Sequence, residues 1–388
     1  MSFKLQQKVK VAVTYDLSEQ LLEILNISNY SKPMIVVDNF LLNSPIVQQT
    51  FKKFDDNEIK YYVYDKITPD PPIDLIDSGA LLFLENNCDS IIAIGGGSVI
   101  DAARGINIVR IFGGSIKEYV EEKQIESSCP GLISVPTTSG TGSELSNALV
   151  VTDTETNEKL AVLSDNAVSE YAVLDPYLVK TLPKSMTIIT GLDVFSHAAE
   201  AYTSKLSSPV VDAICEKIMF LVVKYLPEAV NNPEDLEARE RMMVASALGG
   251  WVLNNGGTHL GHSMAHVIGA KMHIPHGMAC AYSLPVTLSF TAEVEPKKIR
   301  EIGNILGANL PTDITDKKLG ELVSESYKKF RDETLGLQPF ENLNITRDSL
   351  MQLTNDVKNE RFAKNSPFEV TNSLVNTALE VFGEGVKE

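Results

Sequence analysis

The chain has 388 residues, of which 44% are apolar and 22% are charged, a composition typical of globular proteins with roughly 150 residues per domain and two or three domains. Its net charge of −17 repels phosphate backbones and anionic lipids, so we expect no nucleic-acid partner and no membrane partner. No secretory signal and no apolar run of about 18 residues is present, so the sequence predicts a cytoplasmic protein.

The first half of the chain alternates short β-branched runs with amphipathic stretches. Helical periods such as Ile73–Asn86 and Val99–Arg110 separate the first several runs, which is typical of βαβ units around a largely parallel sheet. The later strands follow one another more quickly, as in an appended hairpin or a mixed edge. We predict an α/β domain over residues 1–183, with strands at Met34–Val37, Ile59–Tyr64, Ser90–Ile94, Gly131–Val135, Ala148–Thr152, Leu160–Leu163 and Tyr171–Leu174.

Strand patterns nearly stop after Leu182-Pro183, and apolar residues then recur with the period of an α-helix. This pattern predicts an all-helical second domain over residues 184–388. The predicted helical segments are Ala198–Tyr202, Val210–Tyr225, Leu236–Leu253, Thr258–Met272, Lys297–Leu306, Lys318–Thr334, Arg347–Lys358 and Val370–Phe382.

Asp38 ends the first clear predicted strand, MIVVD. A carboxylate at a strand end can accept both ribose hydroxyls of an adenosine and repel a 2′-phosphate, which favours NAD over NADP. An Asx turn or a cap for the segment that starts at Asn39 explains the same residue equally well.

A glycine turn, Gly95-Gly96-Gly97, links the strand from Ser90 to the helix from Val99. Glycine lets the backbone approach a ligand, and Ser98 is predicted to cap the helix, whose first amides bind anions such as a pyrophosphate. The turn matches neither G-x-G-x-x-G nor a P-loop, so a plain capped turn stays open as the alternative. The glycine turn is thus a candidate phosphate cradle. A second loop, PTTSGTGSE at 136–144, either completes this phosphate cradle with its hydroxyls or is only a loop.

All six histidines lie between positions 197 and 276. Asp193 and His197 are four residues apart and share one helix face, as do His259, His262 and His266 by their spacing. One carboxylate and two or three imidazoles from two helices and a turn suit Zn²⁺ or Fe²⁺. The spacing does not decide which of the three helix histidines binds.

His276 stands between Pro275 and Gly277, which predicts a turn outside the helix. Cys280 follows closely, and we interpret it as a small buried thiol. The four cysteines are scattered without a C-x-x-C pair, which favours reduced thiols over a disulfide framework.

Five motifs in order along the chain resemble the iron-containing (group III) alcohol dehydrogenases, whose relatives include glycerol dehydrogenase and dehydroquinate synthase. They are GGGSVIDAARGI, VPTTSGTGSE, VLDP at 173–176 with TLP at 181–183, TGLDVFSHAAEAY, and GHSMAHVIGAKMHIPHGMACA. The resemblance implies the dehydroquinate synthase-like fold of this family: an α/β nucleotide-binding domain, here residues 1–183, a helical metal-binding and substrate domain, here residues 184–388, and an active site between them. It also implies a homodimer or a larger homo-oligomer.

The resemblance further implies roles for single residues. It assigns the metal to Asp193, His197, His262 and His276, and it makes His266 a candidate catalytic proton relay beside the nicotinamide. It assigns the adenosine ribose to Asp38, the pyrophosphate to Gly96, Gly97 and Ser98, further cofactor contacts to Thr137 and Thr138, and the ribose near the nicotinamide to Lys159. His259 and His273 match no ligand position. Asp70 stands where asparagine is frequent in the family.

The expected activity is the metal-dependent, NAD-linked interconversion of short primary alcohols or diols and aldehydes, with Fe²⁺ or Zn²⁺ as the metal. A glycerol dehydrogenase-like enzyme is an alternative, although the full set of one aspartate and three histidines favours the iron-type alcohol dehydrogenases. A dehydroquinate synthase-like enzyme is another, but it needs more lysine and arginine than the 193–290 stretch contains. A non-catalytic nucleotide or metal sensor is a third class.

Overall fold

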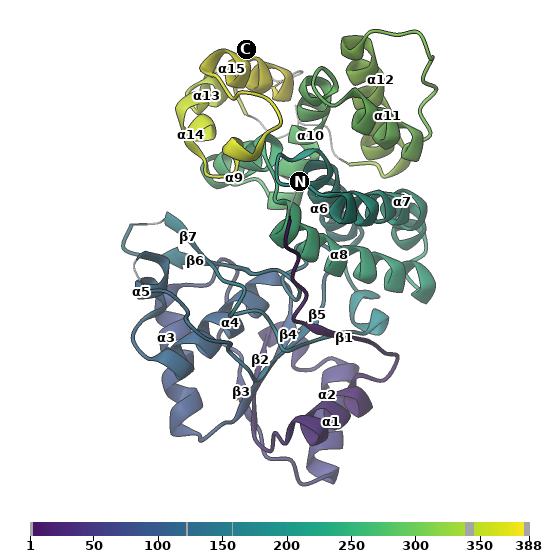
Figure 1. The fold of residues 1–388 in the computed structure, drawn as a ribbon. Coiled ribbons are helices and arrows are strands. Elements are labelled where there is room, and N and C mark those ends of the chain that lie inside the picture. The colour runs from purple at the N-terminus through teal and green to yellow at the C-terminus, as the bar shows by residue number, and fades with distance from the viewer. Residues whose placement is uncertain (1–2, 122, 157, 338–344, 384–388) are drawn as a thin grey trace. The chain divides into compact units, whose positions relative to one another are not determined.

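The computed structural model describes residues 3–121, 123–156, 158–337 and 345–383 (Figure 1). The chain forms two compact units. The α/β unit comprises Gln6–Thr138 and Gly142–Leu182, and the helical unit comprises the described residues 3–5, Ser139–Thr141 and the described chain from Pro183 onward. The predicted fold class, an α/β part followed by an all-helical part, is confirmed.

A six-stranded sheet forms the centre of the α/β unit, and all neighbouring strands in it are parallel. The spatial order is β1-β8-β5-β4-β2-β3, with bounds Lys10–Val13 (β1), Pro33–Val37 (β2), Tyr62–Tyr64 (β3), Ser90–Gly95 (β4), Leu132–Pro136 (β5) and Tyr171–Leu174 (β8). The remaining two strands, Ala148–Asp153 (β6) and Glu158–Leu163 (β7), pair with each other in an antiparallel hairpin, as the sequence predicts.

The edge strand β1 is the strand of this sheet that the sequence analysis missed. Three of its four residues are exposed, and its apolar run, Val11–Val13, is only three residues long and follows the charged Lys10. The central strands β2, β4 and β5 are buried at every position, and such strands appear in a sequence as uninterrupted apolar runs.

Helices cover both faces of the sheet, because alternate strand residues point to opposite sides. Ile35 and Val37 pack with α1 and α2, whereas Met34 and Val36 pack with α3 and α4. The helices are Leu17–Ser28 (α1), Pro45–Asp56 (α2), Ile73–Glu85 (α3), Gly97–Phe112 (α4) and Ile116–Glu121 (α5), with 3₁₀ turns at Asn39–Leu41 (η1) and Pro176–Val179 (η2).

The described residues of the helical unit form no strands. Its helices are Lys184–Thr203 (α6), Pro209–Asn231 (α7), Leu236–Gly256 (α8), Leu260–Met272 (α9), His276–Ala292 (α10), Pro296–Ile305 (α11), Asp316–Lys329 (α12), Arg347–Met351 (α13), Thr354–Asn359 (α14) and Asn372–Phe382 (α15), with short turns at Phe330–Thr334 (η3) and Ala363–Asn365 (η5).

Helix α10 corrects one prediction, because His276 is its first residue instead of part of a turn outside a helix. Pro275 at the N-cap position has φ −54°, which leads directly into a helix. A Cβ on Gly277 would lie 2.3 Å from the carbonyl oxygen of Ile189, so glycine here lets α10 approach the backbone of α6 closely. The sequence pattern missed α10 because it is buried on nearly all sides and lacks an amphipathic period.

The segment Ser139–Thr141 belongs to the helical unit although its neighbours in the chain do not. A Cβ on Gly140 would lie 2.7 Å from Cβ of Thr190, so the backbone of Gly140 packs directly on α6. Thr190 precedes Asp193 by one turn of that helix.

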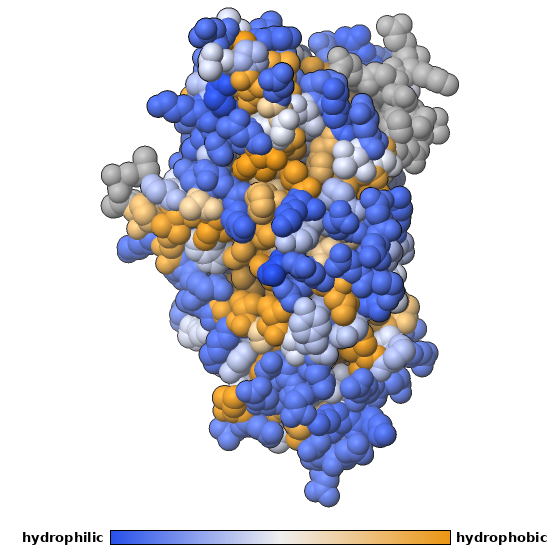
Figure 2. Space-filling view, turned by 90° about the vertical axis from the view of Figure 1, so that its right-hand side faces the viewer, coloured by the Kyte–Doolittle hydropathy of each residue, from blue (hydrophilic) through white to orange (hydrophobic). Residues whose placement is uncertain are grey.

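The surface is consistent with the charge balance of the chain. Hydrophilic residues cover most of the face drawn in Figure 2, with apolar residues exposed between them. Among the described residues, no helix is both long enough and apolar enough to cross a membrane.

Candidate functional site

Donor atoms from three helices of the helical unit gather around Asp193. Asp193 and His197 lie one turn apart on α6, His262 lies on α9, and His276 begins α10. Oδ1 of Asp193 lies 3.6 Å from Nε2 of both His197 and His276 and 3.9 Å from Nε2 of His262. The structure therefore brings together the four residues to which the family resemblance assigns the metal.

The spacing and burial of these atoms fit a divalent cation. Donors bound about 2.0–2.2 Å from a four-coordinate metal lie roughly 3.3–3.6 Å apart, within a few tenths of an ångström of the distances here. The side chains of Asp193 and His262 are each 3% exposed. Oδ1 of Asp193 and Nε2 of His262 have no hydrogen-bond partner among the described residues. A cation between them would satisfy two polar atoms whose burial is otherwise costly.

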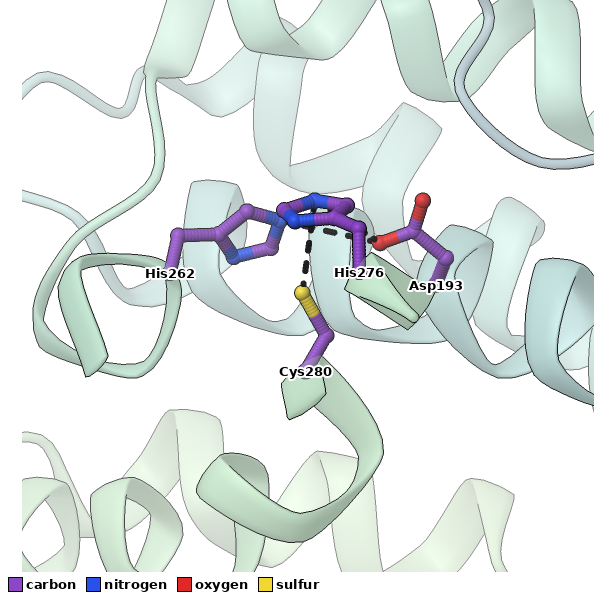
Figure 3. Close-up of side chains that lie close together, drawn as sticks. All are labelled: Asp193, His262, His276 and Cys280. Atoms are coloured by element: carbon purple, nitrogen blue, oxygen red, sulfur yellow. Dashed lines mark hydrogen bonds and ion pairs between the residues drawn. The ribbon is translucent and has the colours of Figure 1, made fainter. Parts of the chain in front are cut away.

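The most compact group of donors also includes a thiol. Asp193, His262, His276 and Cys280 each offer one ligand atom, and these four atoms lie within 4.8 Å of one another (Figure 3). His197 stands outside that group of four. Its ring stacks on that of His262 with centroids 4.9 Å apart.

The protonation states of two residues suit metal binding. Burial lowers the pKa of His197 to about 4 although the nearby Asp193 opposes the change. Burial by itself raises the pKa of Asp193, but the imidazoles of His197, His276 and His262 more than offset it and hold that pKa below its ordinary value. A neutral imidazole and an ionised carboxylate are the forms that bind a cation.

Glu200 positions His262 and was missed by the sequence analysis. Its carboxylate on α6 accepts the backbone N–H groups of His259 (2.6 Å) and His262 (3.3 Å), and its Oε1 lies 3.3 Å from Nδ1 of His262. A carboxylate that holds one ring nitrogen of a histidine orients the other toward a metal. The helical spacing to Asp193 and His197, seven and three residues earlier, was the available signal.

His259 and His273 lie apart from the donor group. His259 is the N-cap residue before α9, so the prediction that it shares a helix face with His262 and His266 is wrong. His259 has a non-helical backbone conformation, and Nε2 of His259 lies 2.9 Å from Oγ1 of Thr203. His273 is the exposed left-handed residue that ends α9 (φ 55°).

His266 lies next to the donor group and has its own carboxylate. Its ring stacks on that of His276 with centroids 5.2 Å apart, and its Nδ1 lies 3.2 Å from Oε1 of Glu360. Glu360 also accepts hydrogen bonds from the Ser263 hydroxyl (2.7 Å) and the Phe362 N–H (2.8 Å). Burial raises the pKa of Glu360, but His266 and these donors lower it to about 2. No sequence motif pointed to Glu360, which comes from a segment 94 residues away.

In the α/β unit, α4 begins directly after the glycine turn. Gly96 is the N-cap residue, so the prediction that Ser98 caps this helix is wrong. Gly96 has extended backbone and its carbonyl accepts the N–H of Val99 (3.0 Å), whereas the Ser98 hydroxyl accepts the N–H of Asp70 (3.4 Å). Glycine is tolerated at an N-cap, and the first amides of the helix, including those of Gly97 and Ser98, form an anion site.

Three further predicted cofactor residues lie at this turn. Asp38 makes no cap hydrogen bond to η1, so the cap alternative is not what the structure has; burial raises the pKa of its carboxyl, and the nearby backbone N–H of Gly96 partly offsets the rise. Thr137 donates its N–H to the carbonyl of Gly95 (3.0 Å), and a Cβ on Gly96 would lie 3.5 Å from Cγ2 of Thr138. Backbone and side-chain groups from the ends of β2, β4 and β5 thus meet around one turn.

The order of the strands makes this place a candidate ligand site. The chain passes from β2 outward to β3 and then returns to β4 and β5 on the other side of β2. The direction reverses between β2 and β4, and ligands of parallel sheets bind at such a switch point, beyond the carboxyl ends of the strands.

A buried arginine that the sequence analysis missed ties the two predicted cradle segments together. Arg104 on α4 donates to the carbonyl oxygens of Ser143 and Ala148. Asp101, one turn earlier, accepts the N–H of Val150 (3.0 Å). The signal was a charged pair, Asp101 and Arg104, in a helix that is buried along nearly its whole length.

Lys159 connects to the glycine turn through Asp70. Its Nζ lies 2.7 Å from Oδ1 of Asp70, and the N–H of Asp70 is the donor to Ser98. Asp70 has φ 54°, a conformation that asparagine and aspartate adopt more readily than most residues.

Comparisons with known proteins identify the family of this chain. A model of the iron-containing alcohol dehydrogenases matches residues 10–176, and one of the C-terminal part of the Fe-containing alcohol dehydrogenase family matches residues 187–381. The NAD-dependent methanol dehydrogenase of Bacillus methanolicus is 35% identical over 279 residues, which cover 72% of this chain and 73% of that protein.

Two solved structures share the fold over nearly the whole chain. A crystal structure of 1,3-propanediol oxidoreductase has a TM-score of 0.92 and 26% identity, covering 98% of this chain and all (100%) of that one. The alcohol dehydrogenase from Oenococcus oeni has a TM-score of 0.91 and 30% identity, covering 99% and 100%.

Proposed function

The chain belongs to the family of iron-containing alcohol dehydrogenases, and from this premise we propose that it interconverts short primary alcohols or diols and aldehydes with NAD as the hydride carrier. The observation that carries the proposal is the placement of three imidazole Nε2 atoms 3.6–3.9 Å from one buried aspartate oxygen. A protein that only binds a nucleotide has no need of such a cluster of metal-binding donor atoms.

We propose that Asp193, His197, His262 and His276 hold a divalent cation, Fe²⁺ or alternatively Zn²⁺, and that Glu200 fixes the direction of His262. When bound, the cation supplies Lewis acidity toward an alcohol hydroxyl or an aldehyde carbonyl, and NAD supplies the acceptor or donor of the hydride. The residues contribute position and charge, since they gather the donors before any ligand arrives.

His266 is the proposed proton carrier. We propose that Nδ1 of His266 donates to Glu360, which leaves the other ring nitrogen, Nε2, to accept a proton. We propose that Nε2 accepts the hydroxyl proton during alcohol oxidation and returns it during aldehyde reduction.

The glycine turn is the proposed dinucleotide site. Gly96, Gly97 and Ser98 present amides to the pyrophosphate, Asp38 accepts the ribose hydroxyls of the adenosine, and Thr137 and Thr138 complete the wall. The carboxylate of Asp38 repels a 2′-phosphate, which supports NAD over NADP. Lys159 reaches the ribose near the nicotinamide once Asp70 releases it.

The substrate class follows from the relatives. The similar proteins act on methanol and on 1,3-propanediol by their names, which supports a small primary alcohol or diol here. We further propose a cytoplasmic homodimer or larger homo-oligomer, by analogy with the family.

The test is NADH formation by anaerobically purified, metal-loaded protein with methanol, ethanol, propanol, butanol and 1,3-propanediol, with metal content measured on the same sample. We expect turnover with at least one alcohol and about one Fe²⁺ or Zn²⁺ per chain. A fully loaded protein that binds NAD but oxidises none of these alcohols and reduces none of their aldehydes would contradict the proposal.

A further inference from the structure

Cys280 lies at the proposed metal centre instead of serving only as a buried packing group. Its Sγ lies 3.5 Å from Nε2 of His276, one helical turn earlier on α10. That same Nε2 lies 3.6 Å from Oδ1 of Asp193. Figure 3 shows the thiol directed at the ring of His276 from the next turn of the helix.

The separations suit a sulfur ligand. With a metal–nitrogen distance of about 2.0–2.1 Å and a metal–sulfur distance of about 2.3 Å, nitrogen and sulfur at neighbouring positions of a five-coordinate centre lie roughly 3.1–3.8 Å apart. The 3.5 Å between Sγ of Cys280 and Nε2 of His276 falls within this range. It fits a shared metal as well as the 3.6–3.9 Å between Oδ1 of Asp193 and the imidazole nitrogens does.

An independent observation favours a cation at the same point. Oδ1 of Asp193 and Nε2 of His262 are buried without a hydrogen-bond partner among the described residues. Both belong to the group of four donor atoms within 4.8 Å that contains Cys280. Cys280 is 2% exposed, so its sulfur is shielded from solvent.

We propose that Sγ of Cys280 is an inner-sphere ligand of the divalent cation in the substrate-free protein, together with Asp193 and the imidazoles. The inference rests on the proposed metal centre and names a ligand beyond the one aspartate and three histidines. A thiolate is a soft donor, so the centre should prefer Zn²⁺ or Co²⁺ to Mn²⁺ more strongly than an oxygen–nitrogen set does.

The test uses full-length protein stripped of metal and reconstituted anaerobically with Co²⁺. Bound Co²⁺ gives visible d–d bands that report the site, and a thiolate ligand adds a sulfur-to-cobalt charge-transfer band in the near ultraviolet. We expect both features in the wild type. C280S should keep the d–d bands, lose the charge-transfer band and bind Zn²⁺ at least about tenfold more weakly in competition with a chromophoric chelator.

The matched control is C215S, which removes a buried thiol on α7 and should keep both features. If C280S does not fold, the triple variant C88S/C129S/C215S, whose remaining thiol is Cys280, should still show the charge-transfer band. Visible d–d bands without a charge-transfer band in the wild type would overturn the role of Cys280 and leave the metal centre standing. Absence of Co²⁺ binding altogether would overturn both.

Discussion

The two sites of this chain are built from different materials. In the helical unit, the proposed metal centre consists of buried side chains whose positions are set by other side chains, such as Glu200 beside His262 and Glu360 beside His266. In the α/β unit, the proposed cofactor site consists of backbone amides at the ends of strands. The difference teaches that residue identity governs the first site, whereas free space around the backbone governs the second.

Buried glutamates in the two units show the same contrast. Burial raises the pKa of Glu200, but His259 and His262 more than reverse the effect and bring it to about 2. Burial also raises the pKa of Glu144, and its backbone hydrogen bond and Arg104 do not compensate, so it reaches about 7. At neutral pH the glutamate beside the donor group of the helical unit is therefore ionised, whereas Glu144 in the α/β unit is only partly ionised.

Removal of a ligand should break the metal centre outright. In H262A we expect loss of the metal and a decrease in kcat of about a thousandfold or more, because several kcal/mol of charge stabilisation disappear. Metal analysis and steady-state kinetics measure both, and circular dichroism checks the fold. H273N changes an exposed histidine in a conformation that asparagine accepts, and it should retain metal and turnover. If H262A keeps its metal, the choice of His262 is wrong.

The contrast between the glutamates predicts a pH effect on stability in the α/β unit. The pKa of Glu144 is above its unfolded value of 4.5, so the folded state retains a proton that the unfolded chain loses. This stability is present below about pH 4.5 and disappears as the pH rises through about 7, with an upper bound of roughly 3 kcal/mol.

E144Q should show a free energy of unfolding that depends less on pH over this range. Urea denaturation at about pH 5 and pH 8 compares the two proteins. Parallel pH dependences would mean that Glu144 is ionised in the folded state, and the contrast with Glu200 would then fail.

A smaller effect is expected when a residue that only orients a ligand is changed. E200Q keeps the size of the side chain but loses the charge that holds His262, so metal affinity should decrease about 10- to 100-fold while NAD affinity stays the same. Chelator competition and NAD titration provide the two measurements. E228Q, an exposed change on α7, is the control. An unchanged metal affinity in E200Q would show that the helices alone position His262.

A substitution that adds bulk to the glycine turn tests the other half of the comparison. A Cβ at Gly96 meets Thr138 at an ordinary contact distance, so G96A should fold with nearly unchanged stability. Its methyl group would take the space of the pyrophosphate, and NAD affinity should decrease about tenfold or more. S98A, which removes a hydroxyl and adds nothing, should lose less. Equal losses in the two variants would mean that side chains matter here as much as space does.

The smallest effect concerns the charge of Asp70. D70N removes a carboxylate next to Ser98 and frees Lys159 from its 2.7 Å ion pair, so NAD affinity should rise about two- to fivefold at low ionic strength and less at high salt. D56N is a distant exposed control. A decrease in affinity would show that the ion pair holds Lys159 in its binding position.

The sequence predicts most of the fold because buried strands and amphipathic helices carry periodic patterns. It fails for β1, a mostly exposed edge strand with an apolar run of only three residues, and for α10, which is buried on nearly all sides and so lacks an amphipathic period. The helix starts were also misjudged, since Gly96 instead of Ser98 caps α4 and His276 begins a helix.

The candidate site follows the same rule. Residues that lie in long motifs, such as Asp193 and His262, are found from the sequence. Residues that act through a neighbour are not, because Glu360 is 94 residues from His266 and only the fold places its carboxylate there. The contact of Cys280 with His276 was visible as a spacing of four, but a lone thiol in an apolar segment carries no chemical signal by itself.

The contribution of Ser139–Thr141 to the helical unit limits how the protein can be divided. A fragment that starts at Pro183 would lack the backbone of Gly140 that packs on Thr190, one turn before Asp193. Cutting the polypeptide between its two halves would thus remove a backbone contact that packs on α6, the helix that carries Asp193. Engineered chimaeras that exchange the C-terminal half should carry this tripeptide with it.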